Sequence, residues 1–349
     1  MTDLKKDQTL SFLLRRFEEA GIQPRHKLGQ NFLMDMNLQK LLVRRADIQP
    51  TDIVLEVGTG TGGVTVQLAE LAGRVITVEL DPQLFVLAGE ELQDYENVVM
   101  LQTDILRNKN TLNPVVMAEI EKARREVRGA ECVSLTEDSG TAAGNAAQRS
   151  DRVVPPNDSP LLSGHCASAS FPAAVSQLKL VANLPYNVAT PIMSNLLALA
   201  EPPRSMTVTI QKEVADRMVA RPGTKDYGAL SVWFQCQAEV EIVRIMPPGV
   251  FFPPPKVYSA IVHVDFSPEK REKVGDLGRF HEFVRAMFFH RRKFLRSELL
   301  SAFKGRVEKP QVDAVLEKTG LSGECRAEEL DVEQMIRLCG EMCEAVGPI

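Results

Sequence analysis

An amide, a proline and an aromatic ring follow one another in the segment Asn183-Leu184-Pro185-Tyr186, directly after the strand-like run 178–182. The side-chain oxygen of Asn183 and the carbonyl of Leu184, which the Pro185 ring holds rigid, can each accept a hydrogen bond from one amino group. The ring of Tyr186 can stack on a flat base. The segment therefore predicts a pocket for a planar base with an exocyclic amine; the alternative is a turn with a buried tyrosine.

A glycine-rich loop lies earlier in the chain and indicates a nucleoside cofactor. Gly58, Gly60 and Gly63 satisfy the pattern G-x-G-x-x-G between an apolar strand and a helix, where glycines let the backbone turn tightly and approach a ligand. Glu79 ends the next strand, so its carboxylate can accept both ribose hydroxyls. Asp104 follows the third strand and could accept from an adenine amine, although an aspartate there is also a common turn residue. The pattern alone leaves NAD, S-adenosylmethionine and a tight turn without a ligand open.

Apolar strands and helical periods alternate from Asp52 onward, and these elements must position the residues above. This alternation is typical of an α/β fold, with a mostly parallel sheet covered by helices on both faces. Asn183 would then lie beside the switch point at which open α/β sheets bind ligands. The seven predicted strands are Ile53–Val57, Val75–Val78, Val98–Leu101, Leu178–Ala182 and Met206–Ile210, then Val240–Met246 and Ala260–Phe266 as a possible antiparallel edge.

Two domains are predicted, because the strands stop after Phe266. Residues 1–266 would form the α/β domain, with a basic N-terminal segment up to about Arg45. Residues 267–349 would form a small all-helical domain. Its predicted helices cover 279–303, 310–318 and 332–345.

The stretch 107–177 interrupts the alternation of strands and helices. Its first part reads as one helix from Pro114 that ends at Gly129, and about half of residues 130–177 are Ala, Ser, Gly or Pro. A segment of that composition buries little apolar area. Residues 130–177 are therefore predicted to be a flexible surface insertion that loops out near the active face; the alternative is a partner-binding segment.

The overall charge gives no sign of nucleic-acid binding, since the 349-residue chain carries a formal net charge of −5. Basic residues are instead concentrated in two patches, the N-terminal segment and the stretch between Phe266 and Arg306. Local patches of this kind can supply phosphate contacts. Four residues on one predicted basic helix are candidate RNA contacts, the alternative being a solvated helix face: Arg291, Arg292, Lys293 and Arg296.

The cysteines and the N-terminus exclude some other classes of protein. Six cysteines show no C-x-x-C pair and no zinc spacing, so no metal site is predicted. The N-terminus lacks the apolar region of a signal peptide, and no run of about 18 apolar residues could span a membrane. A cytoplasmic protein without a membrane contact is expected.

Several stretches, in order along the chain, match one known family: HKLGQNFLMD (26–35), LEVGTGTGGVT (55–65), TVELD (77–81), LQTDIL (101–106), VANLPYNVATPI (181–192), QKEVADRM (211–218), DYGALSVWFQ (226–235), FFPPPKVYSAIV (251–262) and FHRRKFLR (289–296). The sequence thereby resembles the KsgA family of small-subunit rRNA adenine N6-dimethyltransferases. Two departures stand out. Thr59 occupies a position where the family usually has proline, which is expected to change the stiffness of the loop modestly. The segment between Asp104 and Asn183 is also much longer than the family needs.

The resemblance implies a Rossmann-like methyltransferase domain with S-adenosylmethionine as its cofactor. Asn31 and Leu33 would line the methionine and sulfonium region, and Phe252 is a candidate second ring for sandwiching the base, unless it is only a buried strand-end aromatic. The implied cofactor-binding residues are Asn31, Leu33, Gly58, Gly60, Glu79, Asp104 and Asn183; the implied catalytic residues are Asn183, Leu184, Pro185, Tyr186 and Phe252.

The implied reaction is N6,N6-dimethylation of two adjacent adenines in the 3′-terminal hairpin of small-subunit rRNA, by a monomer acting within an assembling subunit. Three alternatives remain. The first is the large-subunit rRNA adenine methyltransferase family that confers macrolide resistance. The motifs L-G-Q-N-F-L, Y-G-A-L-S-V and F-F-P-P-P-K-V favour the small-subunit family over it. The second is a non-catalytic RNA- or DNA-binding relative, which would have no need of Glu79, Asp104 and N-L-P-Y. The third is a NAD oxidoreductase, which offers no reason for N-L-P-Y.

Overall fold

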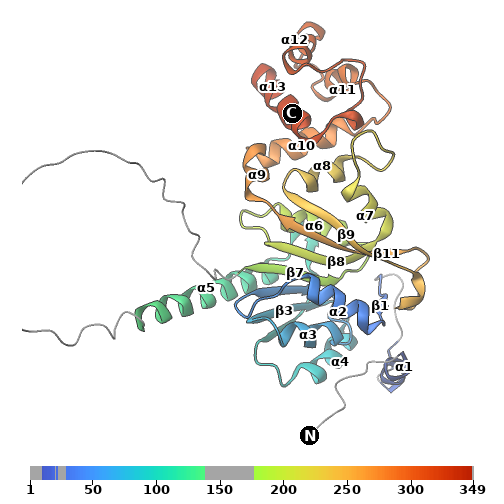
Figure 1. The fold of residues 1–349 in the computed structure, drawn as a ribbon, viewed down its shortest axis with the longest axis vertical. Helices are drawn as coiled ribbons and strands as arrows, with labels where there is room; N and C mark the ends of the chain where they lie inside the picture. Colours follow the sequence, from blue (N-terminus) through green and yellow to red (C-terminus); the bar gives the residue numbers. More distant parts are fainter. Residues whose placement is uncertain (1–9, 20, 23–28, 138–176, 348–349) are drawn as a thin grey trace, which may run out of the picture.

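Seven strands form the central sheet in the order β4-β3-β2-β7-β8-β11-β9 (Figure 1). The first five run parallel, and β11 is antiparallel to both β8 and β9. The computed structural model describes residues 10–19, 21–22, 29–137 and 177–347. It confirms the predicted α/β class and the mostly parallel sheet. The strands are β2 (Ile53–Val57), β3 (Arg74–Glu79), β4 (Val98–Gln102), β7 (Leu178–Asn183), β8 (Ser205–Gln211), β9 (Ala238–Met246) and β11 (Ser259–Phe266).

All five residues of strand β2 are buried. A central strand of this sheet is covered on both faces, so a mostly apolar run of residues is stable there. Successive side chains of a strand point to opposite faces. Ile53, Leu55 and Val57 therefore belong to one core, and Val54 belongs to the core on the other face. The first core also receives α5 (Pro114–Glu137), α6 (Ala189–Leu197) and α8 (Ala229–Gln235); the second receives α2 (Met36–Arg45) and α3 (Gly63–Ala69).

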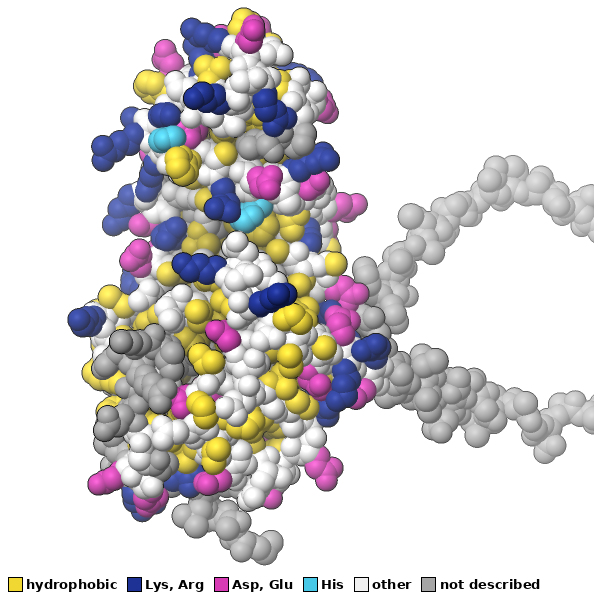
Figure 2. Space-filling view, turned by 180° about the vertical axis from the view of Figure 1, so that it is seen from behind, with side chains coloured by type: hydrophobic (Ala, Val, Ile, Leu, Met, Phe, Trp, Pro, Cys, Tyr) yellow, Lys and Arg dark blue, Asp and Glu magenta, His cyan; other side chains and the backbone are white. Residues whose placement is uncertain are grey.

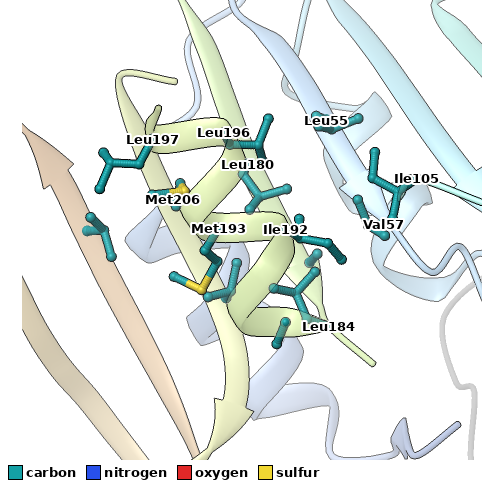
Figure 3. Close-up of a cluster of buried hydrophobic side chains, with 14 of the residues drawn as sticks. Leu55, Val57, Ile105, Leu180, Leu184, Ile192, Met193, Leu196, Leu197 and Met206 are labelled. Atoms are coloured by element: carbon teal, nitrogen blue, oxygen red, sulfur yellow. The ribbon is translucent and has the colours of Figure 1, made fainter. Parts of the chain in front are cut away.

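The packing of α6 fixes the chain directly after Asn183. Figure 3 shows Ile192, Met193 and Leu196 of α6 beside Leu180 of β7 and Leu184, and all of these side chains are buried. The smaller elements around this body are α1 (Leu10–Glu19), α4 (Pro82–Leu92), α7 (Lys212–Val219), a 3-10 turn (Pro248–Val250), and the strand pairs β1 (Phe32–Leu33) with β10 (Phe251–Phe252) and β5 (Leu106–Asn108) with β6 (Thr111–Leu112).

In the described residues that follow β11, all elements are helical, as predicted. They pack around a core that includes Phe280, Phe283 and Met335 (Figure 1, top). The elements are α9 (Pro268–Val274), α10 (Leu277–Met287), α11 (Leu295–Ala302), α12 (Lys309–Thr319), a 3-10 turn (Ala327–Glu329) and α13 (Val332–Val346). No helix among the described ranges is long and apolar enough to cross a membrane.

The single helix predicted over 279–303 is wrong, because a turn over 288–294 separates α10 from α11. Tertiary hydrogen bonds explain the break. The backbone N–H of Leu295 donates to the carbonyl of Cys325 (2.7 Å), and that of Arg296 donates to the carbonyl of Gly323 (3.2 Å). These bonds replace the ones a continuous helix would make. The basic run 291–293 therefore lies in a turn.

The predicted end of a helix at Gly129 is also wrong, since α5 continues to Glu137. A glycine inside a helix costs only about 1 kcal/mol relative to alanine, and residues 130–137 contain no proline. The first part of the segment predicted to be flexible is therefore helical. Residues 138–176, which make up the rest of that segment except for Gln177, lie outside the described residues.

The chain enters β7 at the edge of the sheet opposite to the predicted site. The carbonyl of Gln177 accepts from the N–H of Ile53 (3.0 Å), at the amino end of β2. Glu79 and Asn183 lie at the carboxyl ends of β3 and β7. Because β7 is parallel to β2, a segment that leads into it must arrive at the amino ends. The insertion is expected from the sequence to loop out near the active face. Gln177, the described residue at its C-terminal end, lies instead at the opposite edge of the sheet, so the expectation is wrong for this end of the insertion.

Candidate active site

The carboxyl ends of the parallel strands bring three of the seven predicted cofactor residues together in one cavity. Gly58 follows β2, Glu79 ends β3 and Asp104 follows β4, and all three line one cavity of about 200 Å³, together with Pro185 after β7. We call this space the first cavity. The sheet topology thus converts residues more than a hundred positions apart into one pocket, at the switch point where open α/β sheets bind ligands.

The glycine loop takes a conformation that side chains would disfavour. Gly58 has φ of 86° and Gly60 has φ of 58°, both in the left-handed region that glycine adopts without strain. A Cβ at Gly60 would also lie 3.3 Å from the Phe32 ring. The loop therefore presents bare backbone at the wall of the first cavity.

The Glu79 carboxylate is held by two backbone donors. Its Oε2 accepts from the N–H of Gly60 and its Oε1 accepts from the N–H of Asp81, each at 2.9 Å. Burial raises the pKa of Glu79, while the two backbone donors oppose that shift. Each oxygen keeps a lone pair for a further donor. The side chain is therefore a fixed acceptor pair at the first cavity.

Asp104 combines both roles considered from the sequence. Its Oδ1 accepts from the N–H of Leu106 (2.9 Å), which makes it a turn residue. It also lines the first cavity. A turn geometry and a ligand contact are thus compatible at this position.

Asn183 has one satisfied and one unsatisfied end. Its Nδ2 donates to the backbone oxygen of Asn31 (2.7 Å). Its Oδ1 is buried, and no donor among the described residues reaches it. A buried acceptor without a partner costs roughly 1–3 kcal/mol. The structure therefore leaves the Oδ1 acceptor of Asn183 without a donor among the described residues.

Tyr186 lines a second cavity, of about 380 Å³, together with Asn31, Gln211 and Lys256. Its hydroxyl is hydrogen-bonded to the hydroxyl of Ser259, and burial raises its pKa. Asn187 lines both this second cavity and the first one. The two spaces therefore adjoin, with the N-L-P-Y segment between them.

The remaining residues of the N-L-P-Y segment and of the two short strands have structural contacts. The side chain of Leu184 is buried in the main core. Leu33 is buried in the core beside α2 and lines neither cavity. The Phe252 ring lies 6.4 Å from that of Phe17, centroid to centroid, and pairs in register with Phe32. The structure thus places Leu33 and Phe252 in packing positions rather than on the cavity walls.

Gln30 and Asn187 line the first cavity but were not singled out from the sequence. Both occur inside stretches that resemble the family, HKLGQNFLMD and VANLPYNVATPI. Their types carried no specific signal, because amide side chains are common in loops. Only the spatial arrangement identifies them.

Three of the four candidate RNA contacts lie in the basic turn 288–294 and Arg296 lies in the first turn of α11, and most of the four are in ion pairs. Arg291 is paired with Glu328 and donates to the carbonyl of Lys225, and Arg296 pairs with Asp313 (2.5 Å). Lys293 lies 4.0 Å from Glu298. Arg292 is exposed and has no ion pair within the described part of the chain. Beside it Phe289 is 78% exposed, and Figure 2 shows further Lys and Arg side chains over the C-terminal helices at the top.

A mostly parallel seven-stranded sheet, a glycine loop after β2 and an acidic residue at the end of β3 define a Rossmann-like fold for a nucleoside cofactor, a fold that S-adenosylmethionine-dependent methyltransferases have. A family model narrows this class. It is described as "Ribosomal RNA adenine dimethylase" and matches residues 21–342, so the chain belongs to the ribosomal RNA adenine dimethylase family. The resemblance stated from the sequence is thereby confirmed.

Known relatives and solved structures agree with this family. A ribosomal RNA small subunit methyltransferase A of Geobacillus kaustophilus is 34% identical over 95% of this chain and 94% of its own length. A crystal structure of a dimethyladenosine transferase from Plasmodium falciparum gives a TM-score of 0.64 at 20% identity, covering 91% of this chain and 100% of that one. The 23S rRNA methyltransferase ErmE gives 0.55 at 22% identity, covering 89% and 99%. At these identities the two structures show the shared fold.

Proposed function

We propose that this enzyme transfers methyl groups from S-adenosylmethionine to N6 of two adjacent adenines in the 3′-terminal hairpin of small-subunit rRNA. The observation that carries the proposal is the buried, unpartnered Oδ1 of Asn183, which directly precedes a segment whose Pro185 lines the first cavity and whose Tyr186 lines the second. A relative at 34% identity is a ribosomal RNA small subunit methyltransferase, which favours the small subunit over the large one. We further propose that the enzyme acts as a cytoplasmic monomer on an assembling subunit.

The first cavity fits the nucleoside part of the cofactor. S-adenosylmethionine supplies an electrophilic methyl group on a positively charged sulfur. Glu79, whose two oxygens each keep a lone pair, would accept the ribose hydroxyls, and Asp104 would accept from the adenine amine. Gly58 and Gly60 would let the cofactor approach the backbone. Asn31, which lines the second cavity and is bonded to Asn183, would stand towards the methionine end.

The second cavity fits the target base. Oδ1 of Asn183 and the carbonyl of Leu184 would accept the two N–H groups of the adenine amine, and the Tyr186 ring would stack on the base. Two acceptors on one amino group direct the nitrogen lone pair away from them. No strong base is needed, because the amine becomes acidic once methylated and can release its proton afterwards. Rate enhancement then comes mainly from alignment in a preorganised site.

A substitution at Glu79 tests the cofactor assignment. Glu79→Gln should weaken the binding of S-adenosylhomocysteine by roughly tenfold to a hundredfold, because hydrogen bonds to a charged group are worth about 1.5–3 kcal/mol each. Isothermal titration calorimetry measures this, with a melting curve to show that the variant is folded. Glu70→Gln, an exposed position at the end of α3, is the matched control. Equal affinity in the Glu79 variant and the parent would refute the assignment.

A charge reversal tests the RNA contact in the basic turn. Arg292→Glu should weaken binding to small ribosomal subunits and lower the slope of log affinity against log salt by about one, as expected for the loss of a phosphate contact. Filter binding at several salt concentrations measures both quantities. Arg244→Glu, at an exposed position of the edge strand β9, is the control. Arg291 is less suitable, because its partner Glu328 would be left without its ion pair.

Methyl transfer itself is the decisive experiment. The enzyme would be incubated with labelled S-adenosylmethionine and small ribosomal subunits that lack these modifications, with large subunits in parallel, and nucleosides would be identified by mass spectrometry. Dimethyladenosine in the small-subunit rRNA alone is expected. Label confined to large-subunit rRNA would overturn the proposed substrate. Cofactor binding without transfer to either subunit would contradict the proposed activity on these particles.

A further inference from the structure

Three consecutive residues of the glycine loop are each bonded to one of three consecutive residues of β3. The bonds are Gly58 N–H to Val78 O (2.8 Å), Thr59 Oγ1 to Thr77 Oγ1 (2.6 Å) and Gly60 N–H to Glu79 Oε2 (2.9 Å). The outer two use backbone donors, which every residue type has. The middle one depends on a hydroxyl, so it is the bond that the identity of residue 59 decides.

The direction of the middle bond follows from its neighbours. Thr77 donates its proton to Oε2 of the Glu56 carboxyl (2.7 Å), so its oxygen can only accept from the hydroxyl of Thr59. Thr65 donates to the same Oε2 (2.6 Å). All four side chains are buried. The hydroxyls of Thr59 and Thr77 therefore form a buried series of hydrogen bonds from the glycine loop to the Glu56 carboxyl group on β2.

The position of Thr59 in the glycine loop relates these hydrogen bonds to the proposed cofactor site. Thr59 lies between Gly58, which lines the first cavity, and Gly60, whose N–H holds the Glu79 carboxylate. Both glycines have positive φ, and a glycine has no side chain that restricts its φ and ψ angles. A fixed residue between them limits how far either can turn. Without the Thr59 hydrogen bond, the bond from the Gly60 N–H to the Glu79 carboxylate would be formed in a smaller fraction of the molecules.

We propose that Thr59 is a positioning residue for S-adenosylmethionine, whose buried hydroxyl fastens the glycine loop to β3 and thereby keeps Glu79 aligned for the ribose. The inference rests on the proposed role of Glu79. It replaces the expectation that Thr59 only changes loop stiffness modestly. Residue 59 touches no cofactor atom in this account; it acts through Gly60 and Glu79.

Two substitutions and a control separate positioning from general stability. Thr59→Val keeps the shape and removes the hydroxyl, whereas Thr59→Ser keeps the hydroxyl. Thr65→Val removes the other hydroxyl on Glu56 without touching the loop. Binding of S-adenosylhomocysteine by calorimetry and amide hydrogen exchange of the ligand-free protein are the two readouts.

Thr59→Val should weaken binding by roughly tenfold, because the affinity falls with the fraction of ligand-free protein whose loop is held in the binding conformation, and should speed exchange at the Gly60 amide. Thr59→Ser should bind within about twofold of the parent. Thr65→Val should lower the melting temperature and leave the affinity unchanged. In a double-mutant cycle, adding Thr77→Val to Thr59→Val should cost little further affinity, because both changes break the same bond.

The outcomes distinguish this inference from the proposed function. Unchanged affinity and unchanged exchange in Thr59→Val, while Glu79→Gln still binds weakly, would overturn the role of Thr59 alone. Full affinity in Glu79→Gln would overturn the role of Glu79 and with it this inference. An equal loss of affinity in Thr65→Val would show that the effect of Thr59→Val comes from general loosening of the core, which also overturns positioning.

Discussion

Replacing Asn183 by alanine is expected to lower the rate of methyl transfer by about a hundredfold to a thousandfold, the usual size for loss of one preorganised polar contact to a reacting group. The buried Oδ1 has no donor among the described residues, so its free energy of interaction is available to the bound substrate. Binding of S-adenosylhomocysteine should fall by less than about tenfold, because Glu79 and Asp104 are unchanged. Single-turnover kinetics on small ribosomal subunits measure the rate of methyl transfer, and calorimetry measures the affinity for S-adenosylhomocysteine.

The control for this variant is Asn195→Ala, on α6, whose side chain only donates to the carbonyl of Lys109 (3.1 Å). It should transfer methyl groups at the parental rate. Equal turnover in Asn183→Ala and the parent would remove the central argument for the base pocket. Equal losses in turnover and in cofactor affinity would instead place Asn183 on the cofactor side only.

The second large effect concerns stability and pH. Glu56 is fully buried, and burial raises its pKa from 4.5 to about 8. The folded state therefore keeps a proton that the unfolded chain has already lost, so the free energy of unfolding falls as pH rises from about 4.5 to about 8 and then levels off. At roughly 1.4 kcal/mol per pKa unit, the contribution is on the order of 5 kcal/mol. Glu56→Gln should remove most of this decline.

Urea unfolding of the parent and of Glu56→Gln at pH 5, 7 and 8.5 measures the effect. The difference between the two proteins isolates Glu56 from other groups. Burial lowers the pKa of His263, for example, which acts in the opposite direction below pH 6.5. Glu70→Gln, on the surface, should follow the parent at every pH. A constant difference between parent and Glu56→Gln across this range would contradict a raised pKa for Glu56.

The strands and the residues that follow them could be predicted from sequence because parallel strands are buried on both faces. β2 and β7 appear as short, mostly apolar runs, so Gly58, which follows β2, and Asn183, which ends β7, must lie at one edge of the sheet. Chemistry placed at strand ends therefore follows directly from a correct strand assignment.

Other features depend on contacts between distant segments and leave no local signal. The turn after α10 exists because Leu295 and Arg296 bond to carbonyls of residues 325 and 323. Glu56 interrupts an apolar strand in the sequence, and only the structure shows it buried between Thr65 and Thr77. The inward packing of Leu33 is likewise decided by α2 and β10.

The entry of the chain into β7 has a practical consequence. Gln177 is exposed at the amino ends of the parallel strands, whereas the cavities are lined by residues that end or follow these strands, such as Glu79, Asp104 and Gln211, together with residues 29–31. A fluorophore or a surface tether attached beside Gln177 would thus leave the cavities accessible to ribosomal RNA. Encounters of the enzyme with single ribosomal particles could then be watched from the side of the protein that takes no part in the chemistry.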